Sequence, residues 1–234
     1  MTNQIETLTS SNISGLSGEM IIPGDKSVSH RSLILGGMAI GQTKVTGLLM
    51  GADVLATLDA VRALGVTITR DTNDIVTIDG VGTGGFISPA EALDLGNAGT
   101  GVRLLMGAVA GQPISATFTG DASLSKRPMK RITAPLAQMG AQIEYQPEGE
   151  EKGFLPVTIT GAQPPLPITY EMPVASAQIK SAILFAALNA RGQTVITEPH
   201  LSRDHSEAML GHFCLLYTSP SPRDLSTSRM PSSA

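Results

Sequence analysis

The sequence has little of what several common protein classes require. It contains one cysteine, Cys214, among 234 residues, which excludes a disulfide framework and a cysteine-rich zinc site. Charged residues make up only 15%, and 16 Lys and Arg stand against 20 Asp and Glu, so the net charge is −4. A protein that binds nucleic acid through bulk positive charge is therefore disfavoured, and we expect no nucleic-acid partner.

Long apolar runs are also absent. None approaches the roughly 18 residues that a membrane span needs. The first twenty residues contain neither the basic segment nor the apolar core of a secretion signal. The 41% of apolar residues is nevertheless enough to fill a sizeable core. We therefore expect a cytoplasmic α/β protein that makes no contact with a membrane.

Three stretches of the chain resemble one another. Each has an apolar helix of small residues, a β-branched strand, an amphipathic helix and then two strands of alternating pattern. The amphipathic helix ends at Gly65 in the first copy and at Gly140 in the second. This pattern predicts an α/β domain at 23–213, built from three β-α-β-α-β-β repeats around one core. Their approximate limits are 23–85, 86–163 and 164–213, and the third repeat is incomplete.

The composition changes abruptly after Phe213. Residues 214–234 contain 11 Ser, Thr or Pro and no Gly, and no period of 2 or 3.6 fits them. Disordered tails normally follow a completed domain, whereas this one begins inside the third repeat. We therefore expect residues 214–234 to be a non-native or disordered tail.

Each repeat opens its first helix with groups suited to an anion. The three openings read PGDKSVSHR (23–31), LGNAGTGVR (95–103) and PVASAQIKS (173–181). Free backbone N–H groups and the helix dipole favour a negative charge at such a place. An ordinary capped helix with cations in solvent is the alternative interpretation. If the repeats are related by pseudo-symmetry, the three helix starts converge on one face. The candidate anion-binding residues are Lys26, Ser27, Arg31, Asn97, Gly99, Thr100, Arg103, Ser176, Gln178 and Lys180.

Further cations come before or within the second helices. Arg127 precedes Pro128, which favours a loop conformation there. A guanidinium in such a loop suits a carboxylate or a phosphate. Arg203, in LSRDH, is the corresponding cation of the third repeat, whereas Lys130 and Arg131 are expected to face solvent.

The histidines do not have the spacing of metal ligands, so we expect no metal site. They are interpreted as surface or capping residues, and they are His30, His200, His205 and His212.

Taken in order, the motifs resemble a known enzyme family. PGDKSVSHR, LGNAGTGVR, GDASLSKRPM and PVASAQIKSAILFAAL, with SRDH after them, are similar to the bacterial class II form of 5-enolpyruvylshikimate-3-phosphate synthase. The resemblance covers about 13–213. It implies an enolpyruvyl transferase-like, inside-out α/β fold. It also implies a transferase of the shikimate pathway, in aromatic amino acid biosynthesis, that needs no metal or organic cofactor.

The implied reaction moves the enolpyruvyl group of phosphoenolpyruvate to the 5-hydroxyl of shikimate 3-phosphate and releases phosphate. By the same resemblance, Lys26 is catalytic and touches both substrates. Phosphoenolpyruvate would be bound by Gly99 and Arg127, in a loop shaped by Asn97 and Thr100. Shikimate 3-phosphate would be bound by Ser27, Arg31, Ser176, Ala177, Gln178 and Arg203.

The resemblance also implies a second domain that this chain lacks, and an intact parent that is a monomer. Residues 1–22 would form a strand of that second domain, which would also supply the acid and base carboxylates. We therefore expect the 234-residue chain to be inactive by itself.

Two alternatives remain. The first is the related transferase that acts on UDP-N-acetylglucosamine, whose first helix typically starts Lys-Asn and which uses a cysteine in a mid-domain loop. Here the helix starts DKSVSHR and Cys214 lies in the tail. The second is a non-catalytic, anion-binding half-enzyme, which would bind shikimate 3-phosphate without releasing phosphate.

Overall fold

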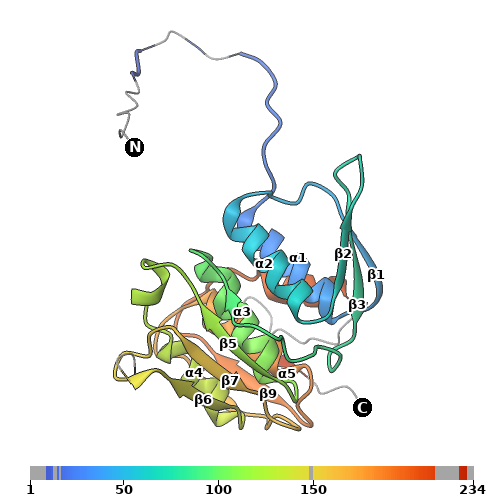
Figure 1. Cartoon of the computed structure of the whole chain (residues 1–234). Coiled ribbons are helices and arrows are strands. Elements are labelled where there is room, and N and C mark those ends of the chain that lie inside the picture. The colour runs from blue at the N-terminus through green and yellow to red at the C-terminus, as the bar shows by residue number, and fades with distance from the viewer. Residues whose placement is uncertain (1–8, 13–14, 16, 148–149, 214–226, 231–234) are drawn as a thin grey trace.

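A computed structural model describes residues 9–12, 15, 17–147 and 150–213, and the backbone of residues 227–230. Figure 1 shows helices packed together with sheets around them, and a stretch without helix or strand, residues 17–25, that leads into the first helix. The first unit begins with helix α1 and has an antiparallel sheet in which β3 lies between β1 and β2. Its elements are α1 (Lys26–Met38), β1 (Ile40–Val45), α2 (Ala52–Ala63), β2 (Thr67–Arg70) and β3 (Val76–Val81).

The second unit repeats this arrangement and adds a leading strand. Strand β7 lies between β5 and β6, antiparallel to both, as β3 does in the first unit, and β4 joins β5 in parallel. A short 3-10 helix, η1, precedes α4. The elements are β4 (Leu93–Asp94), α3 (Gly99–Ala110), β5 (Ser115–Thr119), η1 (Leu124–Lys126), α4 (Lys130–Gln138), β6 (Gln142–Tyr145) and β7 (Val157–Thr160).

The third unit follows the same order as far as its second helix. Its elements are β8 (Thr169–Glu171), α5 (Ala177–Ala187), β9 (Thr194–Thr197) and α6 (His205–His212). Strand β8 joins β9 in parallel, as β4 joins β5, and β10 (Thr227–Met230) pairs with the other edge of β9 in antiparallel fashion. Apart from this backbone pairing, the expected tail lies outside the described residues, and its origin stays a prediction.

The first unit differs from the expected repeat because no strand precedes α1 in the part of the chain described. Met20, Ile21 and Ile22 lie there with exposed side chains, in a stretch that forms neither helix nor strand. The assignment of residues 1–22 to a second domain stays a prediction; residues 1–8, 13–14 and 16 lie outside the described part.

The first helix of each unit forms the centre of the core. Most of α1, all of α3 except Thr100, and α5 apart from Gln178 are buried on every side, which is the pattern of an interior helix rather than a surface one. The strands lie outside them: β1 has no buried residue. The α/β fold expected from the sequence is therefore confirmed, with helices inside and sheets outside.

Helices α3 and α5 touch backbone to backbone. A Cβ added at Gly107 would lie 2.3 Å from the carbonyl oxygen of Ala182, and one added at Gly111 would lie 2.5 Å from that of Ala186. Only residues without a side chain fit at these two points. This crossing holds the first turns of the two helices next to each other.

Glycine also ends the amphipathic helices as predicted. Gly65 follows α2 and Gly140 follows α4, and each has φ of +96°, a left-handed conformation that other residues rarely adopt. Among the described residues, no helix is long and apolar enough to cross a membrane.

Candidate anion-binding site

The N-terminus of α1 presents a capped helix start with an exposed lysine. The carboxylate of Asp25 accepts a hydrogen bond from the backbone N–H of Val28 at 2.8 Å, which fixes the first turn. Lys26 follows, with Nζ 2.9 Å from a carboxylate oxygen of Asp53 on α2; the two side chains are 55% and 28% exposed. The lysine therefore has a local partner but remains open to solvent.

One turn further on, Arg31 is held by the protein itself. It is only 2% exposed. Its Nε donates to Ser206 at 2.7 Å, Nη2 donates to Ser181 at 2.8 Å, and Nη1 donates to the carbonyl of Ser27 at 3.0 Å. Burial lowers the pKa of Arg31 to about 10. From the loop before α6, Arg203 donates to the hydroxyl of Ser27 at 3.3 Å.

The first turns of α3 and α5 are joined through Gln178. Arg103 donates from Nη1 to the amide oxygen of Gln178 at 2.8 Å, and the amide nitrogen of Gln178 donates to the hydroxyl of Thr100 at 3.1 Å. Ser176 caps α5 by accepting from the backbone N–H of Ile179. These contacts bring two of the three predicted helix starts into one cluster.

Two guanidinium groups flank Gly99. A Cβ added at Gly99 would lie 2.9 Å from Nη1 of Arg127 and 3.5 Å from Nη1 of Arg103. Arg127 is anchored by donating to the side-chain oxygen of Asn97, whose amide donates to Asp121 at 2.8 Å. No side chain caps α3 at this point. Backbone N–H groups and two cations therefore face the same small space.

The positive charge in this space is not balanced locally at Arg103. That residue is 5% exposed, and its buried Nε has no hydrogen-bond partner among the described residues. Burial, with the charges of Arg131 and Arg127, lowers the pKa of Arg103 to about 10. An anion bound beside Gly99 would offset the mutual repulsion of the two guanidinium groups. Arg103 was one of the sequence candidates, but only the structure shows why it matters.

The predicted site residues fall into two linked groups. Lys26, Ser27, Arg31 and Arg203 gather at the start of α1, while Asn97, Gly99, Thr100, Arg127 and Gln178 gather at the start of α3. Helix α5 connects them, because it carries both Gln178 and Ser181. Ser176 is its N-cap, and Ala177, buried at its first position, offers only backbone groups.

Two sequence interpretations were wrong. Lys180 does not face the helix start: it is 3% exposed and forms ion pairs with Glu198 and Glu207. His30 is not a surface or capping residue, since it is fully buried and hydrogen-bonds Thr57. Sequence reasoning also missed three residues of this region. Asp53 lies outside the anion-binding motifs, and Ser181 and Ser206 provide only neutral hydroxyls.

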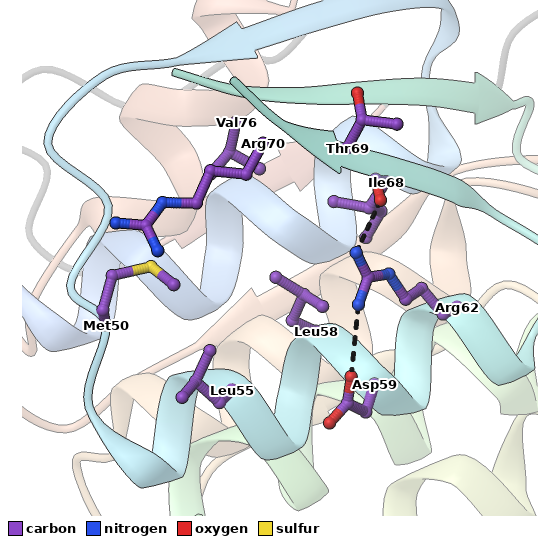
Figure 2. A pocket seen from close by; sticks show the side chains of 9 residues that line it. All are labelled: Met50, Leu55, Leu58, Asp59, Arg62, Ile68, Thr69, Arg70 and Val76. Atoms are coloured by element: carbon purple, nitrogen blue, oxygen red, sulfur yellow. Dashed lines mark hydrogen bonds and ion pairs between the residues drawn. The ribbon is translucent and has the colours of Figure 1, made fainter. Parts of the chain in front are cut away.

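Two hollows in the described part of the chain are lined by residues outside the candidate site. Figure 2 shows a hollow of about 220 Å³ elsewhere, between α2 and strands β2 and β3, where Arg62 bonds the carbonyl of Ile68 and pairs with Asp59. A second hollow, of about 430 Å³, lies at the end of α1 beside Phe213. Neither is lined by a predicted site residue.

Comparison with known proteins points to one family. Residues 11–216 match the family model described as EPSP synthase (3-phosphoshikimate 1-carboxyvinyltransferase). A 3-phosphoshikimate 1-carboxyvinyltransferase from Ruegeria sp. (strain TM1040) is 56% identical over 206 residues, which cover 88% of this chain and 45% of the relative. One from Rhodopseudomonas palustris (strain BisB5) is 54% identical over 219 residues, 93% of this chain and 48% of the relative.

Solved structures agree with this result. EPSP synthase from Acinetobacter baumannii has a TM-score of 0.85 and 49% identity, over 93% of this chain and 47% of that one. The enolpyruvyl transferase NikO from Streptomyces tendae shares the fold, with a TM-score of 0.67 and 18% identity over 94% of this chain and 49% of that one. The chain thus spans about half the length of the relatives it matches.

Proposed function

Because the chain belongs to the EPSP synthase (3-phosphoshikimate 1-carboxyvinyltransferase) family, we propose that it binds shikimate 3-phosphate and phosphoenolpyruvate for enolpyruvyl transfer. In that reaction the bond between C2 of phosphoenolpyruvate and its phosphate oxygen breaks. A bond from C2 to the 5-hydroxyl oxygen of shikimate 3-phosphate forms, and phosphate leaves with the proton that the hydroxyl loses. Both substrates are polyanions, so neutralising and positioning them is a large part of catalysis.

The observation that carries this proposal is the pair of guanidinium groups beside Gly99. Arg103 and Arg127 lie against a helix start that no side chain caps, and Arg103 retains an unpaired buried donor. We assign phosphoenolpyruvate to this place, where Asn97 and Thr100 shape the loop. Its phosphate and carboxylate match the planar donors of two arginines.

Shikimate 3-phosphate is assigned to the neighbouring group at the starts of α1 and α5. Lys26 is the proposed catalytic residue because the family resemblance implies that it touches both substrates, and it is an exposed cation at the start of α1. Bound substrate would compete with Asp53 for its ammonium group. The remaining proposed contacts are Ser27, Arg31, Ser176, Ala177, Gln178 and Arg203. In this assignment Arg31 binds the substrate through the N–H groups that do not donate to the three protein oxygens.

For the whole protein we propose a cytoplasmic monomer of the shikimate pathway. The low cysteine content suits a reducing compartment. Size-exclusion chromatography with light scattering tests the monomer on a protein in which the remaining part of a relative completes this chain, and a dimer mass would contradict it.

Calorimetric titration of the chain with each substrate tests the function. We expect both to bind, and we expect Arg127→Gln to weaken phosphoenolpyruvate binding about tenfold to hundredfold, as loss of a charged hydrogen bond does. Arg191→Gln, at an exposed loop position, is the matched control and is expected to bind like the parent. Tighter binding of UDP-N-acetylglucosamine than of shikimate 3-phosphate would contradict the proposal.

Phosphate release by the same chain is measured in parallel. We expect none from the 234 residues alone, and detectable turnover would contradict that expectation. Binding of shikimate 3-phosphate without turnover is also what a non-catalytic half-enzyme would show. Fusing the chain to the part of a relative that it does not cover distinguishes an enzyme fragment from a non-catalytic half-enzyme. Only the enzyme fragment would then release phosphate.

A further inference from the structure

Three buried charges lie behind the start of α1. Lys180 of α5 has Nζ 2.8 Å from Glu198 and 2.5 Å from Glu207, and all three side chains are at most 5% exposed. Burial alone would lower the pKa of Lys180, but its hydrogen bonds to both glutamates outweigh that effect and raise it. Lys180 is therefore charged, and it is the common partner of two carboxylates.

The two carboxylates stand at opposite ends of one loop. Glu198 follows β9, and Glu207 lies in the first turn of α6, so a single lysine holds both ends of segment 198–207. Glu198 also accepts from the hydroxyl of Ser202 at 2.6 Å. The next residue is Arg203, which reaches Ser27. The position of Arg203 thus depends on Lys180 through a short chain of contacts.

A second layer of contacts ties the same elements to Arg31. Ser181, next to Lys180, hydrogen-bonds Ser206 at 2.6 Å, and Ser206 is next to Glu207. Arg31 donates to both serines. The charges of Arg31 and Lys180 balance those of the two glutamates, and Glu207 acts on Arg31 through space. The buried cluster is neutral only while Lys180 is present.

Such a cluster is not needed for stability alone. A buried ion pair replaced by apolar residues of similar volume often leaves a protein as stable or more so, whereas loss of one partner leaves an uncompensated charge. In this fold the charges instead fix the direction of one loop with respect to α1 and α5. The residue at the centre of that loop is a cation of the proposed substrate site.

We propose that Lys180 is a positioning residue, which holds segment 198–207 so that Arg203 reaches the start of α1 and binds the phosphate group of shikimate 3-phosphate. This inference rests on the proposed function for its ligand. Its structural part, the placement of Arg203 by Lys180, does not require any ligand.

Limited trypsin digestion of the full chain, followed by mass spectrometry, tests the placement. Trypsin cuts after Arg203 and after Arg70, and aspartate follows each, so the second site serves as a reference within the same molecule. We expect Lys180→Met to speed cleavage after Arg203 about tenfold relative to cleavage after Arg70. An unchanged ratio, or an equal rise at both sites, would overturn the placement.

A milder variant keeps the test decisive if Lys180→Met folds poorly. Ser202→Ala removes the hydrogen bond between the loop and Glu198 without leaving a charge unpaired. We expect it to raise the same cleavage ratio by a smaller factor. Lys44→Met, at an exposed position on β1, is the matched control and is expected to leave the ratio unchanged. No rise with Ser202→Ala would count against the proposed chain of contacts.

Calorimetric titration with shikimate 3-phosphate tests the consequence for the site. We expect Lys180→Met to weaken binding about tenfold or more, the effect of losing a charged hydrogen bond. In a variant that already carries Arg203→Gln, the same change should cost little more, because both act through one contact. Additive losses would overturn the positioning role. No binding by the parent chain would refute the proposed function, while the trypsin ratio would still decide the placement.

Discussion

His30 and Thr57 face each other inside the core, with Nδ1 of the imidazole 2.8 Å from the threonine hydroxyl. Both side chains are fully buried. The hydroxyl donates to the carbonyl of Asp53 at 3.2 Å, so it accepts from His30, and Nδ1 carries the proton. The other ring nitrogen is buried and has no hydrogen-bond partner in the described part of the chain. His30 is therefore a neutral histidine between α1 and α2.

This arrangement makes stability depend on pH. Burial lowers the pKa of His30 to about 4, whereas an unfolded histidine titrates near 6.5. Between these values the unfolded chain binds more protons, so acidification favours unfolding. The contribution is complete above about pH 6.5 and is lost as the pH falls towards 4, by about 3 kcal/mol in total. Urea unfolding at several pH values measures it.

The matched variants are His30→Asn and His200→Asn. An asparagine at position 30 still offers an N–H to Thr57 but cannot titrate, so we expect a flatter dependence of the free energy of unfolding on pH. His200 is exposed, and its replacement should leave the dependence unchanged. Equal slopes in all three proteins would contradict the buried, neutral state of His30.

A methyl group at Gly99 should weaken phosphoenolpyruvate binding. In Gly99→Ala the new Cβ would lie 2.9 Å from Nη1 of Arg127, so the guanidinium must move away. We expect about a tenfold loss of affinity, the lower range for a displaced charged hydrogen bond, with a smaller effect on shikimate 3-phosphate. Gly84→Ala, where nothing lies within 4 Å, is the control. Equal affinities by calorimetry would remove Gly99 from the proposed subsite.

Lys26 of the candidate site and the buried Lys180 behind it should differ in what their ion pairs contribute to stability. Lys26 and Asp53 are partly exposed, and we expect Asp53→Ala to lower the free energy of unfolding by less than about 1 kcal/mol. Lys180→Met leaves two buried carboxylates facing each other, and we expect a loss of about 3–5 kcal/mol. Urea denaturation at neutral pH compares them, and similar losses would contradict the difference in burial.

The helix crossing provides a test of packing. Gly107→Ala places a Cβ 2.3 Å from a backbone oxygen of α5, which cannot move aside as a side chain would. We expect a loss of about 1–3 kcal/mol from such overpacking. Gly211→Ala in α6, where nothing lies within 4 Å, should be neutral or stabilising by up to about 1 kcal/mol. A thermal melt of each variant distinguishes the outcomes.

The repeated pattern was readable in the sequence because local rules produce it. The alternation of the strands and the glycines at 65 and 140 depend on neighbouring residues only, and the structure confirms them. The cations at the helix starts were visible for the same reason. Their substrate roles, the inactivity of the chain alone and the second domain stay predictions.

Contacts between distant segments were not readable. Lys180 looked like another cation at a helix start, and nothing near it in the sequence indicates that Glu198 and Glu207 meet it in the interior. The sequence likewise does not indicate that His30 is buried, because its partner, Thr57, belongs to another helix. Which side chain is buried depends on tertiary packing, and a single sequence carries only weak information about that.

The glycines of α3 have an effect beyond the interior. Gly107 lies about two turns from Gly99, and its contact with Ala182 sets how near the two helix axes can approach. The same separation determines the gap between Gly99 and Gln178, which belong to the two proposed subsites. The missing methyl groups at Gly107 and Gly111, in a contact between two backbones, therefore help determine the spacing at which two anions are bound. Engineering of that spacing would begin at this helix crossing rather than among the arginines.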